Sequence, residues 1–318
     1  MNRPGDGDRG EEDRAARSAQ PTMPARSAPP PIALSEFVGG GHGGTVRRSD
    51  VGRLTPAAAR ALSSRGVCHD PDSGPPIAPI AGASVSHDDL VLEAADGTRF
   101  SAFAAGPDTP ARCGVVVLPD VRGLHHFYEE LALRLGEQGV AAVAIDYFGR
   151  TAGVGKRGED FPYKDHVPLT TAAGIQADVA AAVAHLRSRA GVEAVFTIGF
   201  CFGGRHSWLS TAGGHGLAGA IGFYGSTGPR NGEDGPIQRA SELRAPILAL
   251  MGGADQAISA DDVAAFDSAL AEAGVEHEVI TYEGAPHSFF DRKQEQFADA
   301  SADAWRRVLG FLEEHTPA

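Results

Sequence analysis

The stretch "VFTIGFCFGGRH", from Val195 to His206, decides the fold of this chain. Its first half is rich in β-branched and aromatic residues, which predicts a short buried strand. The strand leads into the pattern G-x-C-x-G around Cys201. This is the form of a nucleophile elbow, G-x-S-x-G, with sulfur in place of the hydroxyl. A lone cysteine at a strand end is also a common small hydrophobic core residue. The remaining sequence has to favour one of these two interpretations.

Strands and helices alternate on both sides of this stretch. Two strands joined at Asp96-Gly97 are predicted over residues 88–105, because this dipeptide is a hairpin signal. Further strands are predicted at 113–120, 140–149, 193–200, 217–225, 245–253 and 276–284, with helices at 126–139, 172–191, after Gly203, at 260–274 and at 297–315. This order predicts an α/β fold with a mostly parallel sheet flanked by helices. Cys201 then falls at the carboxyl end of a strand, where active sites of such sheets lie.

Two further polar residues follow strand ends. Asp255 comes after the strand at 245–253, and His287 after the strand at 276–284. Taken singly, an aspartate here is often a helix cap and a histidine after proline a turn residue. A nucleophilic thiol, however, needs a base, and the base needs an orienting carboxylate. The order nucleophile, acid, histidine is that of the α/β-hydrolases. The three residues together therefore predict a catalytic triad, and no G-x-S-x-G occurs in the chain to compete with Cys201.

The oxyanion hole of this fold is built from two backbone N–H groups. One belongs to the residue after the nucleophile, which is Phe202 here. The other comes from the loop after an earlier strand, which is "LPDVRGLHH" in this sequence. Val121 is the predicted second donor.

Charge and cysteine usage exclude several classes of function. The net charge is −13, and the excess of carboxylates lies in residues 81–318, because residues 1–80 carry 10 arginines and 9 carboxylates. An acidic folded body is a poor partner for nucleic acid or an anionic membrane. Cys68, Cys113 and Cys201 lack C-x-x-C spacing, so neither a disulfide framework nor a zinc site is predicted. We expect no cofactor, a small-molecule substrate and a cytoplasmic protein; the oligomeric state is left open.

The first 80 residues differ from the rest in composition and in hydrophobic periodicity. They contain 11 of the 21 prolines and 11 of the 41 glycines, without a helical or strand period. Such composition predicts a mostly disordered arm over residues 1–80, followed by an α/β-hydrolase domain over residues 81–318. Within the arm, "PPIAPIAG" is expected to lie extended against the domain.

Three motifs, "GFCFGG", "GGADQ" and "APHSFF", together resemble the dienelactone hydrolase (carboxymethylenebutenolidase) family of α/β-hydrolases. The resemblance covers roughly residues 90–314. It implies that Cys201 is the nucleophile, that His287 acts as general base and then acid, and that Asp255 orients the histidine. The motifs are specific for the family and much less so for the substrate.

The family also has a carboxylate that holds the resting cysteine in check, and arginines that bind the substrate carboxylate. Asp120 matches the position of the first, although it is one methylene shorter than the usual glutamate; capping a nearby backbone N–H is the alternative interpretation. For the arginines, Arg292 follows the histidine one position out of register. Arg122 and Arg205 are further candidates, with an exposed surface arginine as the alternative for both.

The sequence thus predicts a hydrolase that cleaves a small ester or lactone through an S-acyl enzyme. Two other functions remain open at this point. One is a carboxylesterase or thioesterase that does not accept dienelactones. The other is a non-hydrolytic binding or thiol-sensing protein on the same fold.

Overall fold

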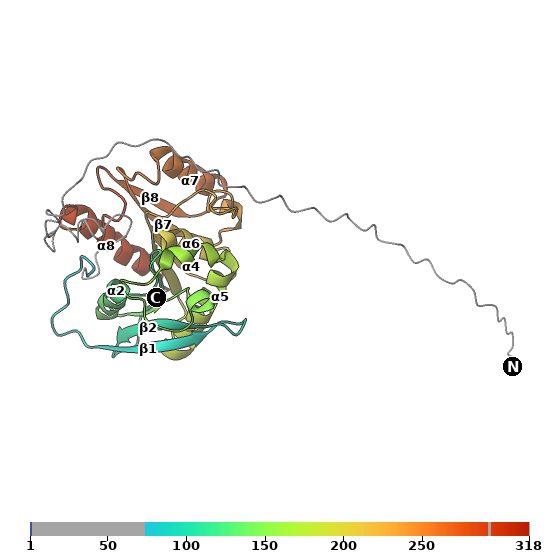
Figure 1. The fold of residues 1–318 in the computed structure, drawn as a ribbon, viewed down its shortest axis with the longest axis vertical. Helices are drawn as coiled ribbons and strands as arrows, with labels where there is room; N and C mark the ends of the chain where they lie inside the picture. The colour runs from blue at the N-terminus through green and yellow to red at the C-terminus, as the bar shows by residue number, and fades with distance from the viewer. Residues whose placement is uncertain (2–73, 292–293, 318) are drawn as a thin grey trace, which may run out of the picture. The chain divides into compact units, whose positions relative to one another are not determined.

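An eight-stranded sheet forms the centre of the fold (Figure 1). The computed structural model describes residue 1 and residues 74–291 and 294–317. Along the sheet the strands follow the order β1-β2-β4-β3-β5-β6-β7-β8. Their bounds are β1 (Val85–Glu93), β2 (Arg99–Pro107), β3 (Cys113–Leu118), β4 (Val140–Ile145), β5 (Val195–Phe200), β6 (Gly219–Phe223), β7 (Ile247–Gly252) and β8 (His277–Tyr282). The strands β1, β2 and β4 pair antiparallel, and all pairs from β4 to β8 are parallel.

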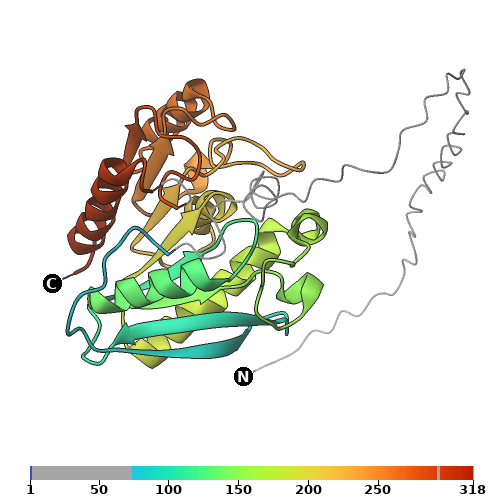
Figure 2. The ribbon, with the colours of Figure 1, turned by 60° about the vertical axis from the view of Figure 1, so that its left-hand side comes forward.

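Helices cover both faces of the sheet. Side chains of α2 and α8 share one core cluster, whereas those of α5, α6 and α7 belong to two other clusters. In Figure 1, α2 and α8 accordingly lie to one side of the strands and α5 and α6 to the other. The helix bounds are α2 (His126–Glu137), α3 (Gly149–Ala152), α4 (Tyr163–His166), α5 (Ala172–His185), α6 (Phe202–Ser210), α7 (Ala260–Glu272) and α8 (Ala298–Glu314). Figure 2 shows the β1–β2 hairpin at one edge of the sheet and α7 beside the opposite edge.

The central strand β3 shows why a continuous apolar run was the signal for a buried strand. Successive side chains of a strand point to opposite faces. Val115 and Val117 therefore pack with the α2 and α8 cluster, whereas Val116 packs with α5. All three are at most 1% exposed. A parallel strand buried on both faces needs apolar residues at every position.

The predicted strands and long helices are all present, with three differences in detail. The helix of the elbow begins at Phe202, before Gly203 rather than after it. The predicted helix at 172–191 ends its α-helical part at His185 and continues as a π-helical turn over Leu186–Ala190. Residues 149–169 contain the short helices α3 and α4 and a 3₁₀ turn, which have too few residues to show a period in the sequence.

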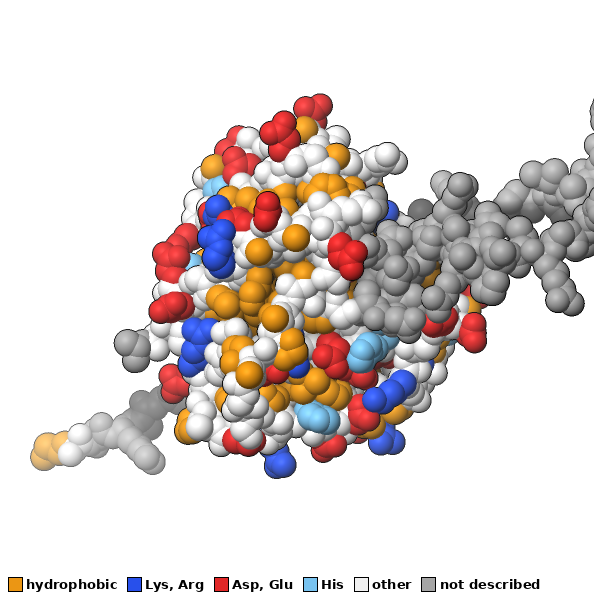
Figure 3. Space-filling model, turned by 90° about the vertical axis from the view of Figure 1, so that its left-hand side faces the viewer, with side chains coloured by type: hydrophobic (Ala, Val, Ile, Leu, Met, Phe, Trp, Pro, Cys, Tyr) orange, Lys and Arg blue, Asp and Glu red, His pale blue; other side chains and the backbone are white. Residues whose placement is uncertain are grey.

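Most of the predicted N-terminal arm, including Cys68, lies outside the described residues, so its predicted disorder stays a prediction. The described segment that resumes at Gly74 contacts the domain. The backbone N–H of Ile80 donates to Glu137 in α2 at 3.0 Å, and Ile77 packs against the α2 and α8 cluster. The segment "PPIAPIAG" therefore packs against the domain as expected, but its path is not extended throughout, because it bends at residue 76 and turns at residues 81–82. Figure 3 shows acidic side chains scattered over one face, as the carboxylate excess requires.

No single helix in the described part of the chain is long and apolar enough to cross a membrane. Residues 163–169 and 172–190 satisfy length and composition only as a pair bent by 95°. The apolar side chains of the second segment, among them Ile175 and Val179, are buried in the core of the domain.

Candidate active site

Cys201 lies in a strained turn between β5 and α6. Its φ of 55° and ψ of −109° belong to a region that non-glycine residues rarely occupy. Such strain persists only where the surrounding structure holds it in place. Here the backbone N–H of Cys201 donates to the carbonyl of Phe223 at 3.0 Å, and its carbonyl accepts from Arg205 N–H at 3.3 Å. The turn thus places the thiol at the N-terminus of α6.

The glycines around Cys201 are required by close backbone contacts. A Cβ on Gly199 would lie 2.0 Å from the carbonyl oxygen of Gly203. A Cβ on Gly203 would lie 2.1 Å from the carbonyl oxygen of Leu118. No side chain fits at either position without moving the backbone. The pattern G-x-C-x-G therefore has a steric cause in this fold.

His287 and Asp255 meet beside the elbow, as the sequence predicts. The Nδ1 of His287 lies 2.6 Å from Oδ2 of Asp255, whose side chain is only 1% exposed. The other carboxylate oxygen accepts the N–H of Ala257 at 2.8 Å, which fixes its orientation. The Nδ1 edge of the ring thus faces the carboxylate. The aspartate therefore selects both the ring orientation and the tautomer.

Cys201 and His287 line one cavity of about 500 Å³. Phe202, Val121 and Arg205, three other predicted site residues, line it as well. The N–H of Phe202 stands in the first turn of α6, where helix geometry leaves an N–H without an intrahelical acceptor. The remaining lining residues are Val167, Pro168, Thr170, Thr171, Ala172, His206, Tyr224, Ser226, Arg230, Asn231, Glu233, Ala257 and Ile258.

Asp120 is fully buried in the loop after β3. Its Oδ1 accepts the backbone N–H of Arg122 at 2.8 Å, so the carboxylate caps a nearby N–H as the alternative interpretation expected. Its own N–H donates to the hydroxyl of Tyr128 at 2.9 Å. Arg122 is 7% exposed and is therefore not a surface arginine. Neither Asp120 nor Arg122 is among the described residues that line the cavity. The gating role of Asp120 stays a prediction.

Arg205 is held by the cavity wall itself. It is 4% exposed, so the surface alternative is wrong for this residue too. Its guanidinium donates to the backbone carbonyls of Gly228, Glu233 and Asp234, the last at 2.8 Å. Burial lowers the pKa of this guanidinium. The contacts tie the loop at 228–235 to α6, and the predicted substrate contact of Arg205 stays a prediction. Arg292, the remaining candidate, lies outside the described residues.

Sequence reasoning missed several residues of the cavity. Tyr224 follows β6, and its ring centroid lies 4.9 Å from that of His287. Its hydroxyl donates to Asp291 at 3.0 Å, which holds the ring in place. The strand-end rule that found Cys201 would also have found Tyr224. His206 could have been found too, since it is one helical turn after Phe202. The wall at 167–172 has no periodic pattern and gave no signal.

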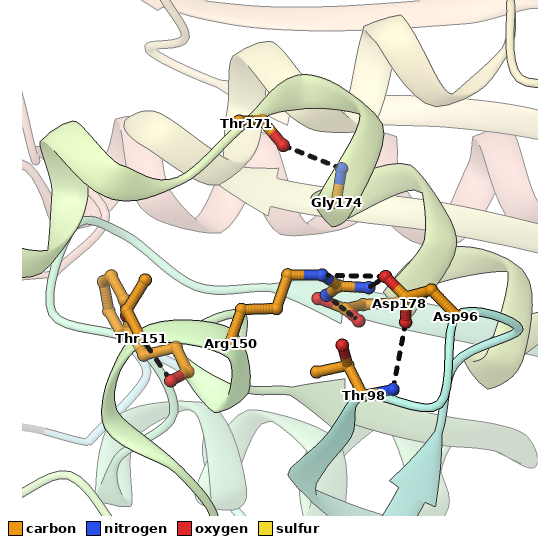
Figure 4. A network of polar contacts seen from close by, with 8 residues as sticks. Asp96, Thr98, Arg150, Thr151, Thr171, Gly174 and Asp178 are labelled. Atoms are coloured by element: carbon orange, nitrogen blue, oxygen red, sulfur yellow. Dashed lines mark hydrogen bonds and ion pairs between the residues drawn. The ribbon is translucent and has the colours of Figure 1, made fainter.

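A network of polar contacts around Arg150 lies near the start of α5 (Figure 4). Arg150 bridges Asp178 on α5 and Asp96 in the β1–β2 turn. Burial, which is the largest cause, raises the pKa of Asp178 to about 6 despite its contact with Arg150. Thr171, which lines the cavity, caps the start of the same helix by accepting the N–H of Gly174 at 3.1 Å.

This raised pKa predicts a pH-dependent stability. Between pH 4 and pH 6 the folded state keeps a proton on Asp178 that the unfolded state has lost, so stability falls as pH rises through this window. Asp178→Asn removes that dependence. The quantity to follow is the free energy of unfolding of Asp178→Asn minus that of the unmodified protein. We expect this difference to rise by roughly 1–3 kcal/mol from pH 4 to pH 7.

Urea unfolding at several pH values measures the effect. Asp96→Asn is the matched control. The contact of Asp96 with Arg150 lowers its pKa from 3.8 to about 2, so above about pH 5 Asp96 is ionised in both states. If the difference in free energy of unfolding between Asp178→Asn and the unmodified protein stays constant from pH 4 to pH 7, the raised pKa is wrong.

No cluster of three or more His, Cys, Asp or Glu side chains suited to a metal ion occurs within residues 74–291 and 294–317. The only described free cysteines are Cys113, which is buried in β3, and Cys201.

Comparison with known proteins finds similar sequences and similar folds. The model of the dienelactone hydrolase family matches residues 100–316. A protein of Escherichia coli strain K12, named "Putative carboxymethylenebutenolidase", is 30% identical over 264 residues, which cover 76% of this chain and 94% of that protein. The solved structure of the "Putative Dienelactone Hydrolase" from Klebsiella pneumoniae is similar at a TM-score of 0.64 and 26% identity. The match covers 72% of this chain and 99% of that one.

A dienelactone hydrolase-like promiscuous phosphotriesterase from metagenomic libraries matches at a TM-score of 0.63 and 23% identity, over 74% of this chain and 100% of that one. This match bears on the fold alone. The fold and family predicted from the sequence are both confirmed. The chain therefore belongs to the dienelactone hydrolase family and is a hydrolase with the α/β-hydrolase fold.

Proposed function

We propose that this hydrolase cleaves a small ester or lactone through a Cys201–His287–Asp255 triad. One observation carries the proposal. A strained, glycine-framed turn holds Cys201 in the same cavity as His287, and the buried carboxylate of Asp255 binds that histidine at 2.6 Å. Nucleophile, base and orienting acid are the three parts that acyl transfer needs.

In the first half of the reaction, the Cys201 thiolate attacks the ester carbonyl carbon and a C–S bond forms. The carbonyl electron pair moves to oxygen and gives a tetrahedral oxyanion. When it collapses, the C–O bond to the alcohol breaks, and the leaving oxygen takes a proton from Nε2 of His287. Asp255 stabilises the imidazolium without accepting its proton. The product is an S-acyl enzyme; for a lactone, the released hydroxyl stays attached to the acyl group.

In the second half, Nε2 of His287 takes a proton from water while the water oxygen adds to the carbonyl carbon of the thioester. The C–S bond of the new tetrahedral intermediate then breaks, and the thiolate of Cys201 is restored. The acid leaves as the second product. The same histidine thus takes the thiol proton as a base, protonates the leaving oxygen as an acid and then acts as a base toward water, which requires the fixed orientation that Asp255 supplies.

The N–H groups of Phe202 and Val121 are the proposed oxyanion donors. Both residues line the cavity, and they come from the start of α6 and from the loop after β3. Removing one such donor typically costs about 2.7–4 kcal/mol of transition-state stabilisation.

The substrate class follows from family and cavity. A cavity of about 500 Å³ suits a small molecule. Curated relatives carry the name carboxymethylenebutenolidase, so dienelactone is the first substrate to test. Turnover of a short p-nitrophenyl ester without turnover of dienelactone would keep the mechanism and favour a general carboxylesterase. A catalytic thiol also needs a reducing compartment to stay free, which supports the cytoplasm as the proposed location.

The test of the triad combines hydrolysis with alkylation. We expect His287→Ala to lower kcat/KM for a p-nitrophenyl ester by about 10²–10⁴-fold, because general acid–base catalysis contributes that much. The same variant should react more slowly with iodoacetamide at Cys201, since the base that activates the thiol is gone.

Peptide mass spectrometry gives the alkylation rate of each cysteine separately. Cys113 is the internal control, because its thiol is 0% exposed and should stay unmodified in both proteins. An unchanged rate of hydrolysis and of Cys201 alkylation in His287→Ala would rule out the proposed pairing.

A further inference from the structure

His206 has no part in the proposed triad, yet it lines the same cavity. Phe202, Arg205 and His206 follow the spacing i, i+3 and i+4, so α6 presents one face to the cavity directly after the nucleophile. The imidazole of His206 packs on Phe202, with ring centroids 4.5 Å apart. An active-site wall made by the helix of the nucleophile thus contains a second histidine.

The two ring nitrogens of His206 have different surroundings. Nδ1 is sealed from solvent and has no hydrogen-bond partner among the described residues. Nε2 also makes no hydrogen bond to a described residue, but it is not sealed. Because the side chain is only 3% exposed and lines the cavity, Nε2 is the nitrogen that faces it.

The protonation of this ring follows from its burial. Burial, and to a lesser extent the charge of Arg205, lower the pKa of His206 to about 3, so the ring is neutral near pH 7. A neutral imidazole has one N–H donor and one bare acceptor nitrogen. A buried N–H without an acceptor is rarer in proteins than an unsatisfied acceptor. The bare nitrogen is therefore Nδ1, and Nε2 carries its hydrogen toward the cavity.

The neighbouring polar group does not compete for this role. The guanidinium of Arg205 donates to three carbonyls of the loop at 228–235 and is held there. The Nε2–H group of His206 is then a hydrogen-bond donor without an acceptor among the described residues. Such a group favours a ligand that carries a hydrogen-bond acceptor.

We infer that His206 is a specificity residue that donates a hydrogen bond to an oxygen acceptor of the substrate other than the reacting ester. The inference rests on the proposed function, because it assumes that the substrate carbonyl lies at Cys201. His206 is four residues after Phe202, which corresponds to about 6 Å along the helix. The preferred substrate therefore carries an ether, carbonyl or hydroxyl oxygen a few bonds from the scissile carbonyl, on its acyl or its alcohol part.

Two isosteric substrate pairs test this inference. On the acyl side, p-nitrophenyl 3-methoxypropanoate replaces one CH₂ of p-nitrophenyl pentanoate by an ether oxygen. On the alcohol side, 2-ethoxyethyl acetate does the same for n-pentyl acetate. We expect the unmodified protein to prefer the ether member of one pair by about tenfold in kcat/KM. Equal kcat/KM values within both pairs would overturn the inference.

Variants then assign the preference to the residue. His206→Leu should remove the preference, measured as the ratio of the two kcat/KM values within the pair. His206→Gln is the rescue variant, since its amide reaches to the position of Nε2 and should restore most of the preference. If His206→Leu keeps the preference, the ring only packs against Phe202 and the inference is wrong.

The substrate pairs need no substitution, so equal kcat/KM values within both pairs would overturn the inference even if His206→Leu does not fold. Failure of the proposed triad gives a different result. In that case Cys201→Ala would still hydrolyse both members of a pair, whatever the preference between them.

Discussion

Cys201→Ala is expected to lose hydrolysis of both dienelactone and a short p-nitrophenyl ester by about a thousandfold or more in kcat. The reason is chemical: without the sulfur no S-acyl enzyme forms. No G-x-S-x-G exists elsewhere in the chain to take over the role. Steady-state kinetics on purified protein measure the loss.

The fold should survive this change. Alanine keeps the Cβ, so the backbone strain at this position is unchanged, and the thiol is partly exposed rather than fully buried. We expect the free energy of unfolding to change by less than about 1 kcal/mol. Cys113→Ala is the control for thiol loss in general and should keep full turnover. Retained turnover in folded Cys201→Ala would sink the proposed mechanism.

Gly203→Ala is expected to have the second largest effect, and here the effect is on the fold. The new Cβ would lie 2.1 Å from the carbonyl oxygen of Leu118 and 2.3 Å from that of Pro119. Both are backbone atoms of β3 and its following loop, so they have no rotamer by which to move away. We expect a loss of about 3 kcal/mol or more in the free energy of unfolding, at or beyond the upper range for overpacked cores.

A matched glycine separates this clash from the general effect of the substitution. Gly310 lies in α8, and a Cβ there would meet no atom within 4 Å. Gly310→Ala should therefore stabilise the helix by up to about 1 kcal/mol. Urea unfolding curves for both variants give the comparison. If Gly203→Ala unfolds at the midpoint of the unmodified protein, the close approach of α6 to β3 is wrong.

The sequence was sufficient to predict the position of residues that lie at strand ends. Buried runs such as that of β3 predict strands, and parallel strands bring their carboxyl ends to one edge. Cys201, Asp255 and His287 could be brought together on that ground alone, and the structure does place the last two in contact. The steric need for Gly199 and Gly203 was likewise readable as G-x-C-x-G.

Residues whose role depends on loop geometry could not be predicted. The guanidinium of Arg205 donates to carbonyls more than 20 residues later in the chain. No sequence pattern near Arg205 predicts these contacts. The contact of the Asp120 carboxylate with the backbone N–H of Arg122 depends on the conformation of their loop, and the gating role of Asp120 stays a prediction. The cavity wall at 167–170, before α5 and its cap Thr171, comes from short turns, and short turns have no period. Side-chain contacts between distant loops depend on the final packing rather than on local sequence.

The most direct test of the central claim is to trap the acyl group. A p-nitrophenyl ester is mixed with the protein, the reaction is quenched with acid during turnover, and the digested peptides are weighed by mass spectrometry. Our account predicts an acyl adduct on the peptide that contains Cys201, removable by hydroxylamine as a thioester should be. An acyl group on another residue, or sustained turnover at saturating ester with Cys201 never modified, would contradict it.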